Sequence, residues 1–182
     1  MTFSSDLIFD GAKKTPYDET DVAKPLNIYG ISKANAEQVV KKVNPEALII
    51  RTSAFFGPWD NYNFAHNVVD ALKHERSFHV VKEVIISPTY VPDLVNAALD
   101  IFIDEEKGIW HLSNEGMVSW SDFASAIAER AGHKKHNLVF KNINEMGWKA
   151  QRPLYSALKS DKGIKLPVWN NALERFFEQK GV

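Results

Sequence analysis

The sequence of 182 residues contains no cysteine. Disulfide-bonded scaffolds, thiol catalysis and thiolate metal sites are therefore excluded, and the composition fits a reducing compartment, so we expect a cytoplasmic protein. No apolar run approaches the roughly 18 to 20 residues that span a bilayer, and no basic region followed by an apolar stretch stands at the start. We therefore expect no membrane partner.

An excess of charge of one sign is also lacking. The chain has 22 basic and 23 acidic side chains and a formal net charge of −1, which excludes a polycationic nucleic-acid-binding protein. Hydrophobic residues make up 45% and charged residues 25% of the chain, and this balance is typical of a folded globular domain. The six histidines are scattered, and we expect no metal site.

The spacing of hydrophobic residues predicts strands and helices that alternate along the chain. Strands are expected at 1–9, 47–51, 84–86, 108–112 and 138–140, and helices at 27–43, 64–76, 92–102, 119–131 and 171–179. The stretch 12–26 contains two prolines and is expected to be a loop. This order predicts an α/β fold with a mostly parallel sheet, although the strands are few for a complete one.

Tyr29 and Lys33 stand four residues apart, so they project from one face of the expected helix. A tyrosine transfers protons near neutral pH when a nearby positive charge favours its phenolate, and Lys33 carries such a charge. A tyrosine-lysine pair alone is more often part of a solvated helix face. Ser4, Ser5 and Asp6 stand 23 to 25 residues before Tyr29, at the end of an expected strand, where open α/β sheets bind ligands.

This combination resembles the extended short-chain dehydrogenase/reductase superfamily, whose proton relay is a serine or threonine, a tyrosine and a lysine four residues later. Separate segments in the same order are similar to those of the dTDP-4-dehydrorhamnose reductases. These segments are Phe3 to Gly11, Tyr17 to Glu19 with Pro25 to Gly30, Arg51 to Gly57 with Asn63-Phe64, Ser87 to Val91, and Arg152-Pro153 with Ser156 and Leu158. Together they extend over nearly the whole chain.

The resemblance implies a catalytic set of Ser5, Tyr29 and Lys33. Tyr29 would be the general acid for the C4 carbonyl oxygen of a dTDP-4-dehydro-6-deoxy sugar, and Ser5 would hydrogen-bond that carbonyl and the phenol. The hydride would come from NADPH or NADH, with Lys33 at the ribose and with Tyr29, Thr52 and Ser53 also at the cofactor. The implied function is a nucleotide-sugar reductase.

The resemblance also implies a substrate-binding set of Asp6, Asn63, Thr89 and Arg152. Arg152 is the candidate for the diphosphate, because a guanidinium forks onto phosphate oxygens. The implied partner is a dTDP-sugar. A sister epimerase or dehydratase acting on another nucleotide sugar is an open alternative, because a shared fold does not determine the reaction.

One feature departs from the reductases. None of the nine glycines stands two positions from another, so the G-x-G core of a dinucleotide-binding loop is absent. The sequence resembles the C-terminal half of such an enzyme: a partial Rossmann-type parallel sheet, the second half of a doubly wound domain, with a small α/β substrate-binding subdomain. We expect the first part to comprise 1–80 and 92–112, and the subdomain to comprise 81–91 and 113–182.

This departure has consequences for activity and for association. We expect the chain alone to be inactive and not to bind NADPH or NADH, because the pyrophosphate site is missing. The first strand would expose an unpaired edge, to be covered by self-association or by an N-terminal half. A non-catalytic regulatory or interaction subunit of the same fold remains an alternative, although the intact Ser5, Tyr29 and Lys33 argue against it.

Overall fold

The computed structural model describes residues 1–180. Its strands are β1 (Thr2–Ser5), β2 (Leu48–Thr52), β3 (Phe55–Phe56), β4 (Phe78–Val81), β5 (Ile85–Ile86), β6 (Thr89–Tyr90), β7 (Gly108–His111), β8 (Asn114–Glu115), β9 (Val118–Ser119), β10 (Leu138–Lys141) and β11 (Leu166–Val168). Its helices are α1 (Ile28–Val43), α2 (Phe64–Lys73), α3 (Val91–Ile103), α4 (Trp120–Arg130) and α5 (Trp169–Lys180), with short 3₁₀ turns η1 (Asp6–Ile8), η2 (Lys135–Asn137) and η3 (Ile143–Glu145).

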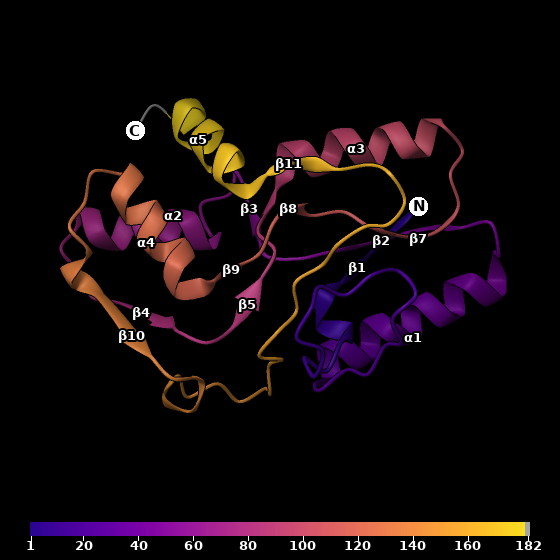
Figure 1. The fold of residues 1–182 in the computed structure, drawn as a ribbon, viewed down its shortest axis with the longest axis horizontal. Coiled ribbons are helices and arrows are strands. Elements are labelled where there is room, and N and C mark those ends of the chain that lie inside the picture. The colour runs from indigo at the N-terminus through magenta and orange to yellow at the C-terminus, as the bar shows by residue number, and fades with distance from the viewer. Residues whose placement is uncertain (181–182) are drawn as a thin grey trace.

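One half of the molecule, which we call the sheet lobe, is built on a parallel sheet with the strand order β1-β2-β7. All five residues of β2 are buried, as expected for a strand covered on both faces. Helix α3 packs on the sheet through Leu94 and Ile101, and Ala34 of α1 packs with Ile8 and Phe9 in a separate cluster. The α/β fold with a mainly parallel sheet is thereby confirmed (Figure 1).

The other half, the aromatic lobe, contains α2, α4 and α5 with the strand pairs β4–β10 and β5–β9 (Figure 1). Its core gathers Phe56, Phe123 and Phe176 with aliphatic side chains from these elements. Ser119 caps α4 by accepting a hydrogen bond from the Asp122 N–H at 3.0 Å. Helix α2 and strand β4 pack with α4 and β10. The sequence-based division instead places α2 and the first three residues of β4 in the first part, which ends at residue 80.

A connecting segment, residues 142–165, runs from β10 to β11 and passes between the two lobes (Figure 1). It forms isolated bridges with both of them: Leu158 pairs with Tyr17, and Tyr155 pairs with Ile85. The carbonyl of Tyr17 accepts a hydrogen bond from the Lys159 N–H at 2.9 Å. The connecting segment therefore contacts both lobes through its backbone.

The five expected helices are all present, with ends that differ by a few residues from the expected bounds. The strand expected over 1–9 is too long, because the Ser5 side chain accepts a hydrogen bond from the Leu7 N–H and starts η1 instead. Strands β3, β4, β6, β8, β9 and β11 were not expected. Within residues 1–180, no helix combines the length and apolar character needed to cross a membrane.

Candidate active site

A cleft of about 1190 Å³ opens at the carboxyl ends of β1 and β2. The two strands are parallel, and Ser5 pairs in register with Thr52, so both strands end at one edge of the sheet. This edge is where open α/β sheets bind ligands. Six of the nine predicted site residues line the cleft, namely Ser5, Asp6, Tyr29, Thr52, Ser53 and Arg152.

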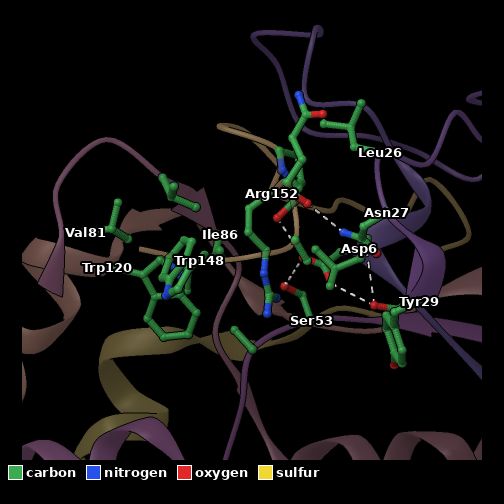
Figure 2. A pocket seen from close by; sticks show the side chains of 18 of the residues that line it. Asp6, Leu26, Asn27, Tyr29, Ser53, Val81, Ile86, Trp120, Trp148 and Arg152 are labelled. Carbon is green, nitrogen blue, oxygen red and sulfur yellow. Dashed lines mark hydrogen bonds between the residues drawn. The ribbon is translucent and has the colours of Figure 1, made fainter. Parts of the chain in front are cut away.

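Asp6 is the buried centre of the polar wall of this cleft (Figure 2). Its carboxylate accepts three hydrogen bonds: from Ser5 Oγ at 3.1 Å, from Ser53 Oγ at 2.9 Å and from Ser156 Oγ at 2.6 Å. Burial raises the pKa of Asp6, and the serine hydrogen bonds oppose this shift because they stabilise the charged form. The carboxylate thus joins β1, the end of β2 and the connecting segment.

Tyr29 is the second residue of α1, and the glycine beside it explains its position. Asn27 caps the helix, because its Oδ1 accepts the Gly30 N–H at 2.9 Å while its Nδ2 donates to the Gln151 carbonyl at 2.8 Å. A Cβ on Gly30 would lie 2.1 Å from the Leu7 carbonyl oxygen, so only glycine permits this approach. The approach sets the first turn of α1, with its half-exposed Tyr29, against η1 beside the cleft.

Lys33 lies one turn further along α1 and does not line the cleft. Its Nζ donates a hydrogen bond to the Phe3 carbonyl oxygen at 3.2 Å and stands 5.8 Å from the centroid of the Tyr29 ring. The ammonium group is therefore tethered to β1 and lies beside the phenol. The four-residue spacing thus places the two side chains next to each other, and their catalytic roles stay a prediction.

The end of β2 contributes two buried hydroxyl side chains, Thr52 and Ser53. Ser53 donates to Asp6, whereas Thr52 Oγ1 has no hydrogen-bond partner among residues 1–180. Ala54 follows with a φ of 41°, a left-handed conformation that is uncommon for a residue with a Cβ, and it turns the chain toward β3. Buried hydroxyl groups are normally hydrogen-bonded, so a ligand in the cleft is a suitable partner for Thr52 Oγ1.

The opposite wall is apolar. Val81, Ile86, Trp120 and Trp148 line it, from β4, β5, the start of α4 and the connecting segment (Figure 2). The Arg152 guanidinium lies 5.6 Å from the centroid of the Trp148 ring, a distance at which the ring face attracts a cation. The cleft therefore has a hydroxyl-rich and acidic wall, an aromatic and aliphatic wall, and an arginine supplied by the connecting segment.

Two predicted substrate residues do not line this cleft. Asn63 caps α2, because its Oδ1 accepts the His66 N–H at 3.0 Å and its Nδ2 donates to the Gly57 carbonyl at 2.9 Å. Thr89 is fully buried in β6, where its Oγ1 donates to the Ser87 carbonyl at 3.4 Å. Both side chains hold local structure, and their contact with a substrate stays a prediction.

A buried ion pair joins α1 to β2. Arg51 of β2 donates to Glu37 of α1 through two bonds, Nε to Oε1 at 2.9 Å and Nη2 to Oε2 at 2.7 Å. Burial raises the pKa of Glu37, but hydrogen bonds and nearby positive charge, with Arg51 as the first contributor, outweigh burial and hold this pKa below its ordinary value. Burial, together with the Arg51 charge, lowers the pKa of His111 to about 4, so this ring is neutral at pH 7.

Several residues of the site were not assigned from the sequence. Ser156 belongs to the motif that begins at Arg152, yet no spacing rule shows that it reaches Asp6, which stands 150 positions earlier. Asn27 is a typical helix N-cap residue and is recognisable as one in the sequence. Nothing in the sequence around Trp148 indicates that it lines the cleft. Within the described chain, no three His, Asp or Glu side chains form a group that could hold a metal ion.

A parallel sheet with hydroxyl and carboxyl groups at its strand ends, next to a helix that bears a tyrosine-lysine pair, defines a Rossmann-like protein of the short-chain dehydrogenase/reductase type. Distant structures share this fold. The dTDP-glucose 4,6-dehydratase of Bacillus anthracis superposes with a TM-score of 0.83 at 14% identity, over 97% of this chain and 60% of that chain. At this identity the likeness concerns the fold alone.

A family model described as RmlD substrate binding domain matches residues 1–181, and the chain belongs to this family. The spore coat polysaccharide biosynthesis protein SpsK of Bacillus subtilis is 34% identical over 97% of this chain, and a dTDP-4-dehydrorhamnose reductase of Aggregatibacter actinomycetemcomitans is 35% identical over 94%. The crystal structure of the dTDP-4-dehydrorhamnose reductase of Bacillus anthracis in complex with NADP superposes with a TM-score of 0.91 at 35% identity, over 97% of this chain.

The chain spans 63% of the length of both of these curated relatives and 64% of the crystallised reductase. The resemblance inferred from the sequence is confirmed by the family match, and so is the partial extent of the likeness.

Proposed function

We propose that the chain forms the catalytic and substrate-binding part of an NAD(P)-dependent nucleotide-sugar reductase that acts on the C4 ketone of a dTDP-4-dehydro-6-deoxy sugar. The observation that carries this proposal is the convergence of Ser5, Asp6, Tyr29 and Arg152 on one cleft. These residues come from three different segments of the chain. The proposed reaction class is supported by membership of a family whose relatives include dTDP-4-dehydrorhamnose reductases.

The proposed chemistry adds a hydride to C4 and a proton to its oxygen. When bound, NADPH or NADH supplies the hydride. Tyr29 gives its phenolic proton to the C4 oxygen, and the Lys33 ammonium, 5.8 Å from the ring, stabilises the phenolate that remains. Arg152 binds the diphosphate through its planar fork of N–H donors, which fixes the sugar relative to Tyr29.

The residues at the end of β2 fit the nicotinamide end of the cofactor. Thr52 Oγ1 is buried beside the cleft without a partner in the described chain, and Ser53 is adjacent to it. No glycine pair of the G-x-G kind is available to cradle the pyrophosphate. We therefore propose that this chain alone binds NADPH weakly and does not sustain turnover.

A division of labour between the two parts of the chain is also proposed. Residues 1–80 and 92–112 would form the Rossmann-like part with the catalytic helix, and residues 81–91 and 113–182 would form the substrate-binding subdomain. Of the proposed substrate residues, Thr89 and Arg152 belong to the subdomain, whereas Asp6 and Asn63 belong to the first part. Packing supports moving α2 and β4 to the second group, because they share a core with α4 and β10. The connecting segment, with Arg152, belongs to the second group.

The edge of β1 is the proposed site of association. In the described residues β1 pairs on one side only, with β2, and α1 exposes Ile28, Val39 and Val43. We propose that a second copy or a further N-terminal segment covers this edge. Size-exclusion chromatography with light scattering tests this, and a stable monomer that binds no apolar dye would refute it.

Calorimetry with dTDP, a dTDP-hexose and NADPH tests the proposed function. We expect the chain to bind dTDP and the dTDP-hexose, and to bind NADPH much more weakly. Arg152→Gln should weaken dTDP binding about tenfold, because one charge-assisted contact to the diphosphate is lost. The matched control is Arg76→Gln, which removes an exposed arginine that does not line the cleft and should leave the affinity unchanged.

Two results would count against the proposal. Failure of wild-type protein to bind either nucleotide would reject a preformed substrate site and favour an interaction subunit of the same fold. Equal affinity of Arg152→Gln and wild type for dTDP would remove Arg152 from the diphosphate site.

A further inference from the structure

Residues 148–153 of the connecting segment line the cleft, and this stretch contains Arg152. Among residues 1–180, a single hydrogen bond joins the stretch to the rest of the chain: Asn27 Nδ2 donates to the Gln151 carbonyl oxygen at 2.8 Å (Figure 2). The Arg152 guanidinium lies 5.6 Å from the centroid of the Trp148 ring, which belongs to the same stretch. The position of Arg152 in the cleft therefore depends on a bond made by its neighbour.

The two ends of the stretch show why this bond matters. Pro153 is buried beside Gly11, where an added Cβ would lie 2.7 Å from the Pro153 Cβ. The other end follows Gly147, which has a φ of 67°, in the left-handed region that glycine adopts freely. Packing thus fixes the chain directly after Arg152, and the Asn27 bond fixes it directly before. Without that bond, a ligand that binds at Arg152 would have to order the stretch, which costs affinity.

Asn27 also forms a bond in the opposite direction. Its Oδ1 accepts the Gly30 N–H at 2.9 Å and caps α1, in the turn that carries Tyr29. A carboxamide holds an acceptor oxygen and a donor nitrogen on one carbon, so a single side chain makes both bonds. A helix cap needs only the oxygen, and aspartate or serine caps about equally well. Helix capping alone therefore does not account for the donor end of Asn27.

We propose that Asn27 is a positioning residue that couples the diphosphate site to the catalytic helix. It holds Arg152 in the cleft through Gln151 and, with the same carboxamide, it fixes the turn that presents Tyr29. A dTDP-sugar bound at Arg152 is thereby placed at a set position relative to the phenol. The inference rests on the proposed function, because Arg152 and Tyr29 take their roles from it. Removal of the donor end should weaken nucleotide binding and leave the helix stable.

The test replaces Asn27 by serine, which keeps a capping oxygen and lacks the amide that reaches Gln151. By calorimetry we expect Asn27→Ser to bind dTDP about fivefold more weakly than wild type, because one hydrogen bond is lost. The urea midpoint of unfolding should stay at the wild-type value. Asn44→Ser, the same change at the exposed C-terminal end of α1, is the matched control and should alter neither quantity.

A double-mutant cycle shows whether Asn27 acts through Arg152. In an Arg152→Gln background, Asn27→Ser should change dTDP affinity by less than about twofold, because the side chain that Asn27 positions is gone. An equal loss of affinity in both backgrounds would overturn the proposal. So would a dTDP affinity of Asn27→Ser equal to that of wild type.

A measurement without ligand tests the tether by itself. Trypsin cleaves after Lys149, an exposed residue of the stretch, when the local chain opens. Asn27→Ser and Asn27→Asp, a second variant that caps without a donor, should both be cut there about fivefold faster than wild type. Equal cleavage rates would overturn the tether. Failure of wild type to bind dTDP would instead reject the proposed function, and the cleavage rates would still decide whether Asn27 holds the stretch.

Discussion

The two lobes bury different kinds of side chain. The sheet lobe encloses charged and polar groups, with Arg51 and Glu37 at 4% and 5% exposure and His111 at 2%. The aromatic lobe encloses rings: Phe123 lies within 5.5 to 6.3 Å of Phe56 and of three other aromatic rings. The cleft lies where the two lobes meet. The sheet lobe supplies most of its polar wall, the aromatic lobe supplies most of its apolar wall, and the connecting segment adds Ser156 to the first and Trp148 to the second.

The two kinds of buried side chain suit the two lobes to different tasks. Hydrogen-bonded charges fix side chains in one orientation, because each bond has a direction, whereas packed rings supply shape and apolar surface. Orientation is needed where a proton is transferred, and shape is needed where a ligand is enclosed.

Truncation of the aromatic core should have the largest effect. Phe123→Ala removes a ring that is 1% exposed, and we expect the free energy of unfolding to fall by about 4 kcal/mol. Phe102→Ala, at a ring that is 53% exposed, should change it by less than about 0.5 kcal/mol. Urea unfolding measures both, and similar losses for the two variants would contradict the description of this core.

Breaking the buried ion pair should come next. Arg51→Met leaves the Glu37 carboxylate buried without its partner, and we expect a loss of about 3 kcal/mol in the free energy of unfolding. The double variant Arg51→Met with Glu37→Leu should recover most of this loss, because no charge is then stranded. Arg76→Met, at an exposed pair with Asp70, should cost less than about 1 kcal/mol. If the double variant were as unstable as the single one, the loss would not come from an unpaired Glu37 charge.

The close contact at Gly30 should rank third. Gly30→Ala places a Cβ 2.1 Å from the Leu7 carbonyl oxygen, so the first turn of α1 must move, at a cost of about 2 kcal/mol. Since Tyr29 and the Asn27 cap move with it, dTDP-glucose binding should weaken as well. Asn35→Ala, on the exposed face of the same helix, is the control. Wild-type stability in Gly30→Ala would show that the contact relaxes freely.

The smallest effect should be a pH dependence that belongs to the sheet lobe. Burial and the Arg51 charge lower the pKa of His111 from 6.5 to about 4, so the unfolded chain binds this proton first as the pH falls. The contribution is complete above pH 6.5 and is lost between 6.5 and 4. It amounts to about 1 kcal/mol between pH 6 and pH 5. Unfolding of wild type and His111→Gln at several pH values measures it, and parallel curves would contradict it.

Side-chain placement is predictable from the sequence where the signal is local. Tyr29 and Lys33 are brought together by helical spacing, and Ser5 stands in a stretch with a strand pattern, so these residues are found from their neighbours in the chain. The bonds that orient them are not local. The Ser156 to Asp6 bond joins residues 150 positions apart, and the need for Gly30 depends on η1 as a neighbour, so neither follows from composition or periodicity.

Four of the six strands that the sequence pattern does not predict have a similar explanation. Strands β3, β6, β8 and β9 have two residues each, too few to show an alternation, and they form because neighbouring segments hold them. The early end of β1 had a readable signal, since Ser5 followed by Asp6 is a typical start of a helical turn. The motif around Ser5 indicates a catalytic hydroxyl, but the same side chain also caps the 3₁₀ turn η1.

The bond between Asp6 and Ser156 also constrains the order of folding. Ser156 stands 150 positions after Asp6, so this partner of Asp6 is synthesised long after Asp6 itself. Contacts this distant in sequence close large loops and form late. The sheet can pair and the aromatic core can collapse earlier, but the cleft wall is complete only when the connecting segment docks. Ligand binding should therefore be the last native property to appear during refolding.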